Sequence, residues 1–184
     1  MTTVDANIHA AITAGAWHRD VMIGDPVLTA SASAALLQHW RQRNECAVRP
    51  NRLPRAVMHG ATAWTQHHTQ VVGAVHLPVD RHAIVVSNHF APLENLAVRQ
   101  ALGNQRLFIV SALSNLAMPG ALGWLMRHAD TLPVAGDLHY MGRAFPRLLA
   151  QRLGLGPVLM YPEQSLWLNY RKPRPGQVGA YHYA

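Results

Sequence analysis

The sequence has little cysteine, little lysine and few acidic residues, and each scarcity narrows what the chain can be. Cys46 is the only cysteine among 184 residues, so neither an intrachain disulfide nor a thiolate metal site can form, and a reducing compartment is favoured. Lys172 is the only lysine, and arginine supplies nearly all of the basic charge behind a formal net charge of +7. A basic surface attracts anionic lipid, phosphorylated substrates and nucleic acid alike.

Several sequence motifs that mark particular classes of protein are absent. No paired CxxC element or aromatic RNP motif stands beside the scattered arginines, which argues against a nucleic-acid partner. The chain also lacks a GxSxG elbow, a P-loop and a GxGxxG element. These motifs define serine hydrolases and nucleotide-dependent enzymes, so their absence argues against both classes. The histidines at 67, 68, 76 and 82 have no ligand-like spacing, and we predict no metal site and no bound cofactor.

Long uninterrupted apolar runs are missing as well. Residues 1–16 lack the basic start and continuous apolar stretch of a secretory signal, which predicts a cytoplasmic protein. Residues 107–126 have the length of a membrane span, but Ser, Asn, Pro and Gly interrupt them. We therefore expect a strand, a turn and a helix there instead of a lipid-facing helix.

The order of apolar patterns predicts an α/β fold. With 49% hydrophobic residues the chain can bury one sizeable core, so we expect a single structural unit with an N-terminal helical region, 1–82, packed on a second region, 83–184. Helical spacing predicts helices at 31–42, 56–66, 92–102, 119–128 and 142–153, and residues 44–54 are predicted to form a loop. Short apolar runs at 83–86, 107–111 and 157–161, with a further segment at 131–134, predict a mixed, mostly parallel sheet flanked by helices.

One candidate catalytic pair follows the first predicted strand. His89 stands just beyond that strand, and Glu94 comes five residues later, after Pro92 has opened a helix. A neutral imidazole can remove a proton from a hydroxyl, and a carboxylate on its other ring nitrogen fixes the tautomer. On one regular helix the two side chains would diverge, so the pair requires His89 to lie in the loop before the helix.

These residues resemble two motifs of one family. Asn88-His89 followed by Glu94 is similar to the HxxxxD motif of the glycerolipid acyltransferases, which include glycerol-3-phosphate and lysophosphatidic acid acyltransferases. Tyr161-Pro162-Glu163-Gln164-Ser165 looks like the family's FPEGT or FPEGS element, and residues 118–127 resemble the segment before the family's second motif. Because ligands bind at the carboxyl ends of parallel strands, both motifs are expected at one site.

The resemblance implies roles for the matching residues. His89 would be the general base and Glu94 its orienting acid, while Glu163, Gln164 and Ser165 would line the acceptor site. The basic cluster that follows is suited to a phosphate group, and its candidate residues are Arg171, Lys172 and Arg174. Solvated surface is the alternative for that cluster, and core packing is the alternative for the apolar residues 107–126.

The chain also departs from the family pattern. Glutamate replaces aspartate at Glu94, Gln164 stands where the family has glycine, and Leu166 stands where an arginine often follows. Residues 131–136 carry no arginine, although the family's second motif often ends in one, with Arg143 and Arg147 as the nearby substitutes. Only nineteen residues follow Ser165, so the region 83–184 is expected to be short at its C-terminal end.

Together these features predict transfer of a fatty acyl group from acyl-CoA or acyl-carrier protein to the hydroxyl of a lysophospholipid or glycerol phosphate. The alternative is a non-catalytic, basic protein that binds lipid or a membrane surface through a degraded acyltransferase fold. An anionic membrane is an expected partner in both cases, with a peripheral position on the inner face of the cell membrane. A nucleic-acid-binding module is the third and least favoured class.

Overall fold

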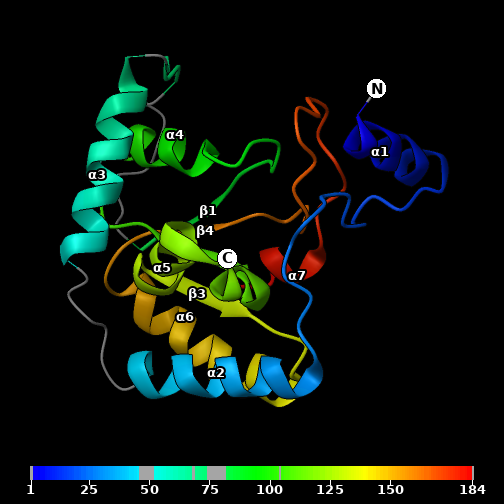
Figure 1. The fold of residues 1–184 in the computed structure, drawn as a ribbon. Helices are drawn as coiled ribbons and strands as arrows, with labels where there is room; N and C mark the ends of the chain where they lie inside the picture. The colour runs from blue at the N-terminus through cyan, green and yellow to red at the C-terminus, as the bar shows by residue number, and fades with distance from the viewer. Residues whose placement is uncertain (1, 46–51, 68, 74–81, 104, 184) are drawn as a thin grey trace.

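A computed structural model describes residues 2–45, 52–67, 69–73, 82–103 and 105–183 (Figure 1). Its regular elements follow the chain as α1 Thr3–Thr13, α2 Ala30–Asn44, α3 Arg52–Gln66, β1 Ile84–Val86, α4 Glu94–Ala101, β2 Phe108–Ala112, the 3-10 helix η2 Leu113–Ala117, α5 Gly120–His128, β3 Thr131–Val134, the π-helical turn η3 Tyr140–Ala144, α6 Phe145–Leu153, β4 Val158–Met160 and α7 Val178–Tyr181. Strands alternate with helices, which confirms the α/β class.

The four strands form one sheet in the order β1-β4-β2-β3. All three pairings are parallel, so the sheet is more uniform than the mixed one expected from the sequence. The two central strands, β2 and β4, begin with Phe108 and Val158, both almost fully buried. Pro133 lies on the edge strand β3, where a missing backbone N–H costs the ladder least.

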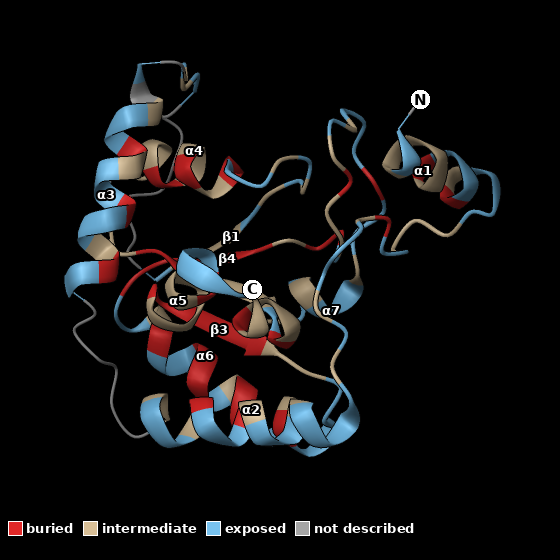
Figure 2. Cartoon of the chain, viewed as in Figure 1, coloured by how far each residue is buried: buried red, intermediate tan, exposed pale blue. Residues whose placement is uncertain are grey.

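The main core lies between this sheet and the helices α2 and α6, which share one side of it in Figure 1. Leu37 and Trp40 of α2 pack there with Phe145, Leu148 and other residues of α6 and the sheet. A second cluster joins Met58 of α3, Leu96 of α4 and Ala129. Figure 2 shows buried residues on β3, on β4 and on the inward faces of these helices, whereas β1 is intermediate to exposed.

The N-terminal segment packs against the end of the chain. Ile8, Ala11 and Val21 surround the fully buried Trp167, and Trp17 stacks on the same indole with ring centroids 6.1 Å apart. The α1 helix begins with a capping box in which Thr2 and Asp5 exchange hydrogen bonds. The sequence patterns predicted no helix before residue 31, and this N-terminal segment covers the part of the chain that carries the second motif.

Two predicted boundaries are wrong. The loop predicted at 44–54 ends earlier, because α3 begins at Arg52 and holds Pro54 in its first turn, where a missing backbone N–H is tolerated. The last long helix also begins two residues sooner, with the π-helical turn at Tyr140. Cys46, together with the other residues between Glu45 and Arg52, lies outside the described residues.

Candidate active site

The sheet register brings the two sequence motifs together. Val86, the last residue of β1, pairs with Met160, the last residue of β4, and the Ser87 N–H donates to the Met160 carbonyl at 3.3 Å. The loop after β1 and the turn after β4 therefore leave the same edge of the sheet side by side (Figure 1). Two segments about seventy residues apart in sequence begin at one place.

Main-chain hydrogen bonds hold the first of these loops in place. The carbonyl of His89 accepts from the Trp167 N–H at 3.1 Å, and the carbonyl of Phe90 accepts from the Asn169 N–H at 2.9 Å. His89 thus lies in a fixed loop before α4, as the pairing with Glu94 requires. Its side chain is 23% exposed, so part of the imidazole reaches solvent.

His89 and Glu94 form a direct pair. The imidazole Nδ1 contacts Glu94 Oε1, while the other carboxylate oxygen accepts from the backbone N–H groups of Phe90 and Ala91 at 2.8 and 2.9 Å. The Glu94 side chain is only 5% exposed. A carboxylate beside Nδ1 keeps the proton on that nitrogen and leaves the Nε2 lone pair available as a base.

The extra methylene of glutamate is accommodated by the way Glu94 folds back. Glu94 is the first residue of α4, and its carboxylate returns over the preceding turn to reach two N–H groups there. This position also favours a negative charge, because unpaired N–H groups gather at a helix N-terminus. The substitution of glutamate for aspartate is therefore compatible with an oriented imidazole.

Tyr161 packs against one face of the His89 imidazole. Its ring stacks on His89 with centroids 4.1 Å apart and an interplanar angle of 14°. Burial raises the pKa of the Tyr161 hydroxyl far above its usual value, and the charge and hydrogen bond of Glu94 add to that rise. The sequence placed Tyr161 in a motif without giving it a role, since its proximity to His89 comes from the β1–β4 pairing.

Glu163 lies beneath the same loop and not on the surface. It is 5% exposed, and its Oε2 accepts from the His89 backbone N–H at 3.2 Å. Oε1 accepts from the Arg174 N–H at 2.9 Å, and the Arg174 guanidinium donates to Oε2 through Nη2 and Nε at 2.9 and 3.1 Å. With these bonds made, the carboxylate positions the loop that carries His89 and has little capacity left for a substrate.

Arg174 is enclosed on every side. Its guanidinium lies 4.4 Å above the Trp167 ring and donates to the Trp17 carbonyl at 2.9 Å and to Ser165 Oγ at 3.1 Å. Burial lowers the pKa of Arg174, and Glu163 opposes that shift. The side chain of Arg174 is fully buried, so the predicted contact with a substrate phosphate has no free donor to make it.

The remaining predicted substrate residues divide into two groups. Ser165 Oγ donates to the Arg19 carbonyl at 3.0 Å, which turns it toward the N-terminal segment. Gln164 is exposed, with a φ of +66° that glycine adopts more easily. Arg171 and Lys172 are both exposed, so of the basic cluster these two side chains are accessible to a phosphate.

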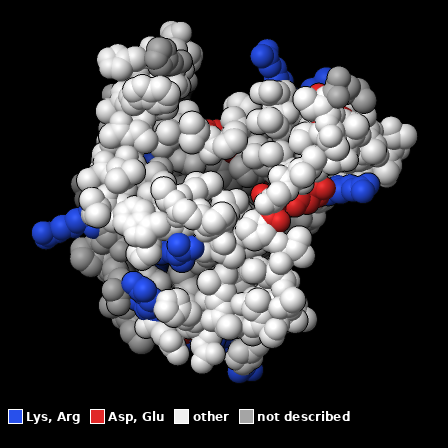
Figure 3. All heavy atoms as spheres, viewed as in Figure 1, with Lys and Arg blue, Asp and Glu red and all other residues white. Residues whose placement is uncertain are grey.

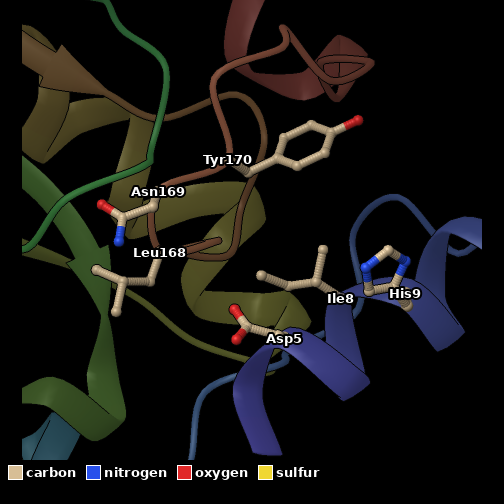
Figure 4. Close-up of a pocket in the computed structure, with 6 residues that line it drawn as sticks. All are labelled: Asp5, Ile8, His9, Leu168, Asn169 and Tyr170. Carbon is tan, nitrogen blue, oxygen red and sulfur yellow. The ribbon is translucent and has the colours of Figure 1, made fainter. Parts of the chain in front are cut away.

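The surface is hollowed next to this site. Figure 3 shows the depression between the side formed by α3 and α4 and the side formed by α1 and the segment 163–174. A separate open pocket of about 350 Å³ lies between α1 and residues 168–170 (Figure 4). Its lining, taken from the described residues, includes Asp5, His9 and Tyr170 but neither His89 nor Glu163, so we do not assign it to the reaction.

Among the residues that the structure describes, no group of three or more His, Cys, Asp or Glu is placed to hold a metal ion. Two of the histidines considered for such a site, His68 and His76, lie outside the described residues. Within the described ranges no helix combines the length and the apolar character needed to cross a membrane.

No protein-family profile, curated protein or solved structure matches the chain. The site combines an oriented, partly exposed imidazole, a buried carboxylate in contact with it, and two exposed cations on a nearby segment.

Proposed function

We propose that the chain is an acyltransferase in which His89 activates the hydroxyl of a lysophospholipid or glycerol phosphate. The observation that carries the proposal is the contact of His89 Nδ1 with a Glu94 carboxylate that Phe90 and Ala91 already hold in place. An imidazole oriented in this way can act as a base through Nε2. The likeness of both motifs to the glycerolipid acyltransferases supports the same reaction.

In this reaction His89 Nε2 removes the proton of the acceptor hydroxyl as its oxygen attacks the thioester carbonyl of acyl-CoA or acyl-carrier protein. Glu94 stabilises the imidazolium that forms. When the tetrahedral intermediate collapses, the C–S bond breaks and the imidazolium returns the proton to the departing sulfur. The products are an ester and a free thiol, and the protein itself carries no acyl group.

Arg171 and Lys172 are the residues that we propose for the acceptor's phosphate, since both are exposed and follow the Glu163 turn in the chain. Substituting either with alanine is expected to raise KM for a phosphate-bearing acceptor about three- to tenfold with kcat nearly unchanged. Arg43→Ala, which removes an exposed arginine from α2, is the matched control. Equal effects of all three substitutions would show only a general influence of charge.

The decisive test is transfer of a labelled acyl chain from acyl-CoA or acyl-carrier protein to lysophosphatidic acid or glycerol 3-phosphate. His89→Ala should lower kcat at least about a hundredfold, the usual contribution of a general base, with an unchanged circular-dichroism spectrum. His39→Ala, an exposed histidine on α2, should be fully active. Undiminished turnover by His89→Ala would refute the role of His89 as base.

A specific observation also favours the second candidate, a non-catalytic protein that binds the inner face of a membrane. Leu53, Val57 and Trp64 of α3 are 65%, 47% and 67% exposed, and their spacing puts them on one face of the helix. No acidic residue occurs between residues 46 and 79, whereas Arg52 and Arg55 belong to α3 itself. Exposed apolar side chains beside cations suit the surface of an anionic bilayer.

Sedimentation with vesicles separates the two candidates. Trp64→Ala should weaken binding to vesicles that contain phosphatidylglycerol about tenfold, while Leu122→Ala on α5, which is similarly exposed, should have no such effect. Vesicle binding without acyl transfer by the intact chain would favour the non-catalytic candidate. Transfer that requires both His89 and Trp64 would favour an enzyme that acts at the membrane.

A further inference from the structure

The ring of Tyr161 is fixed beneath His89 by the sheet itself. Tyr161 is the first residue after β4, and β4 pairs in register with β1, which leads directly into the His89 loop. The rings of Tyr161 and His89 lie nearly parallel, 14° apart, with a centroid separation of 4.1 Å. At that separation the two faces are in van der Waals contact, so the phenol ring limits tilting of the imidazole.

The other member of the pair holds the imidazole at one ring nitrogen. The Glu94 carboxylate accepts from His89 Nδ1 and is itself held by the N–H groups of Phe90 and Ala91. A contact at one nitrogen leaves the imidazole free to tilt about that contact. The Tyr161 ring, which packs against the face of the imidazole, restricts this tilt.

We propose that Tyr161 is a positioning residue of the active site, whose ring holds the plane of the His89 imidazole. Without the ring, the imidazole would lose the contact on one of its faces and Nε2 its direction. Phenylalanine at this position would supply the same ring, so the role belongs to the ring and not to the hydroxyl.

Two substitutions test the role of the ring. Tyr161→Leu removes the ring, and kcat should fall about tenfold or more while KM changes little, as expected when a catalytic group is misaligned. Tyr161→Phe keeps the ring and should restore kcat to within about threefold of the unaltered chain. The matched control is Tyr140→Leu, which removes a buried ring of the main core away from His89 and should lower stability without lowering kcat.

The kinetic measurement rests on the proposed function, so a second measurement is made without substrate. In the proton NMR spectrum of the intact chain at neutral pH, the His89 Nδ1–H resonance should broaden in Tyr161→Leu, because the imidazole tilts more freely and its proton exchanges faster with water. It should stay sharp in Tyr161→Phe and in Tyr140→Leu. An unchanged resonance in Tyr161→Leu, or an equal loss of kcat in Tyr161→Phe and Tyr161→Leu, would overturn the positioning role of the ring. Absence of acyl transfer by the unaltered chain would count against the proposed function alone, because the resonance still reports on Tyr161.

Discussion

The carboxylate of Glu163 accepts a hydrogen bond at 3.2 Å from the backbone N–H of His89, 74 residues earlier in the chain. The same carboxylate holds the buried guanidinium of Arg174. The turn of the second motif therefore holds the loop of the first motif in place, and Glu163 positions the proposed base by bonding to its backbone. We expect its loss to be felt first in the stability of the loop that carries His89.

Glu163→Gln is predicted to destabilise the protein by about 3–5 kcal/mol, because it leaves the enclosed Arg174 without a counter-charge. Urea unfolding followed by circular dichroism measures the loss. The control is Glu45→Gln, which breaks partly exposed pairs with Arg41 and Arg147 and should cost less than about 1 kcal/mol. A small effect of Glu163→Gln, comparable to that of the control, would contradict the structural role of the buried pair.

Glu94→Asp is predicted to lower kcat about ten- to a hundredfold. From the same backbone position a carboxylate one methylene shorter cannot reach both His89 Nδ1 and the N–H groups of Phe90 and Ala91. Steady-state acyl-transfer kinetics would measure the loss, and the thermal transition would report any change of fold. An aspartate variant more active than the unaltered chain would mean that the glutamate arrangement is not the productive one.

Gln164→Gly is predicted to stabilise the protein by about 0.5–1 kcal/mol. The backbone at Gln164 has a φ of +66°, which costs an L-residue more than glycine, and part of that gain is lost to the greater freedom of glycine in the unfolded chain. Calorimetry should show a rise in Tm of about 1–4 °C. Asn169→Gly, at a φ of 60°, should gain less, because asparagine tolerates this conformation; a larger gain there would argue against the explanation.

Stability is predicted to fall steeply above about pH 10, the ordinary pKa of tyrosine. Burial raises the pKa values of Tyr140 and Tyr161, so the folded state keeps these protons at a pH where the unfolded chain releases them. Each raised pKa contributes to the free energy of unfolding. This contribution is complete below the tyrosine pKa of the unfolded chain and declines as pH rises above it, by up to about 1.4 kcal/mol per pH unit for each group. Urea titrations between about pH 9 and 11 would measure how the free energy of unfolding falls with pH. The fall should be shallower for Tyr140→Phe than for Tyr181→Phe, whose ring is exposed. Equal slopes for the two variants would contradict the role of the buried tyrosine.

Much of the fold could be predicted because its patterns are local. The apolar runs that become β1, β2 and β4 are short and bounded by turn residues, and helical spacing identified α2, α4 and α5 close to their observed ends. The contact of His89 with Glu94 was also within reach, since five residues and one turn separate them. Each of these inferences depends on side chains only a few positions apart.

The part that escaped prediction depends on contacts between distant segments. Arg174 belongs to the same basic cluster as Arg171, and no neighbouring residue marks it as buried. Its enclosure depends on the Trp17 carbonyl, 157 residues away, and on the Trp167 ring. The support of His89 by Tyr161 likewise depends on strand pairing that no local pattern reveals.

The order β1-β4-β2-β3 also has a consequence for synthesis. Among the strands of the described residues, β1, which precedes His89, is the first to leave the ribosome, and β4, its neighbour in the sheet, is the last. The loop after β1 has to wait for Trp167, Asn169 and Glu163, and Glu163 in turn needs Arg174. The site is therefore among the last parts of the nascent chain to take shape, and a nascent chain that has not yet exposed Arg174 carries His89 without all the partners that hold its loop.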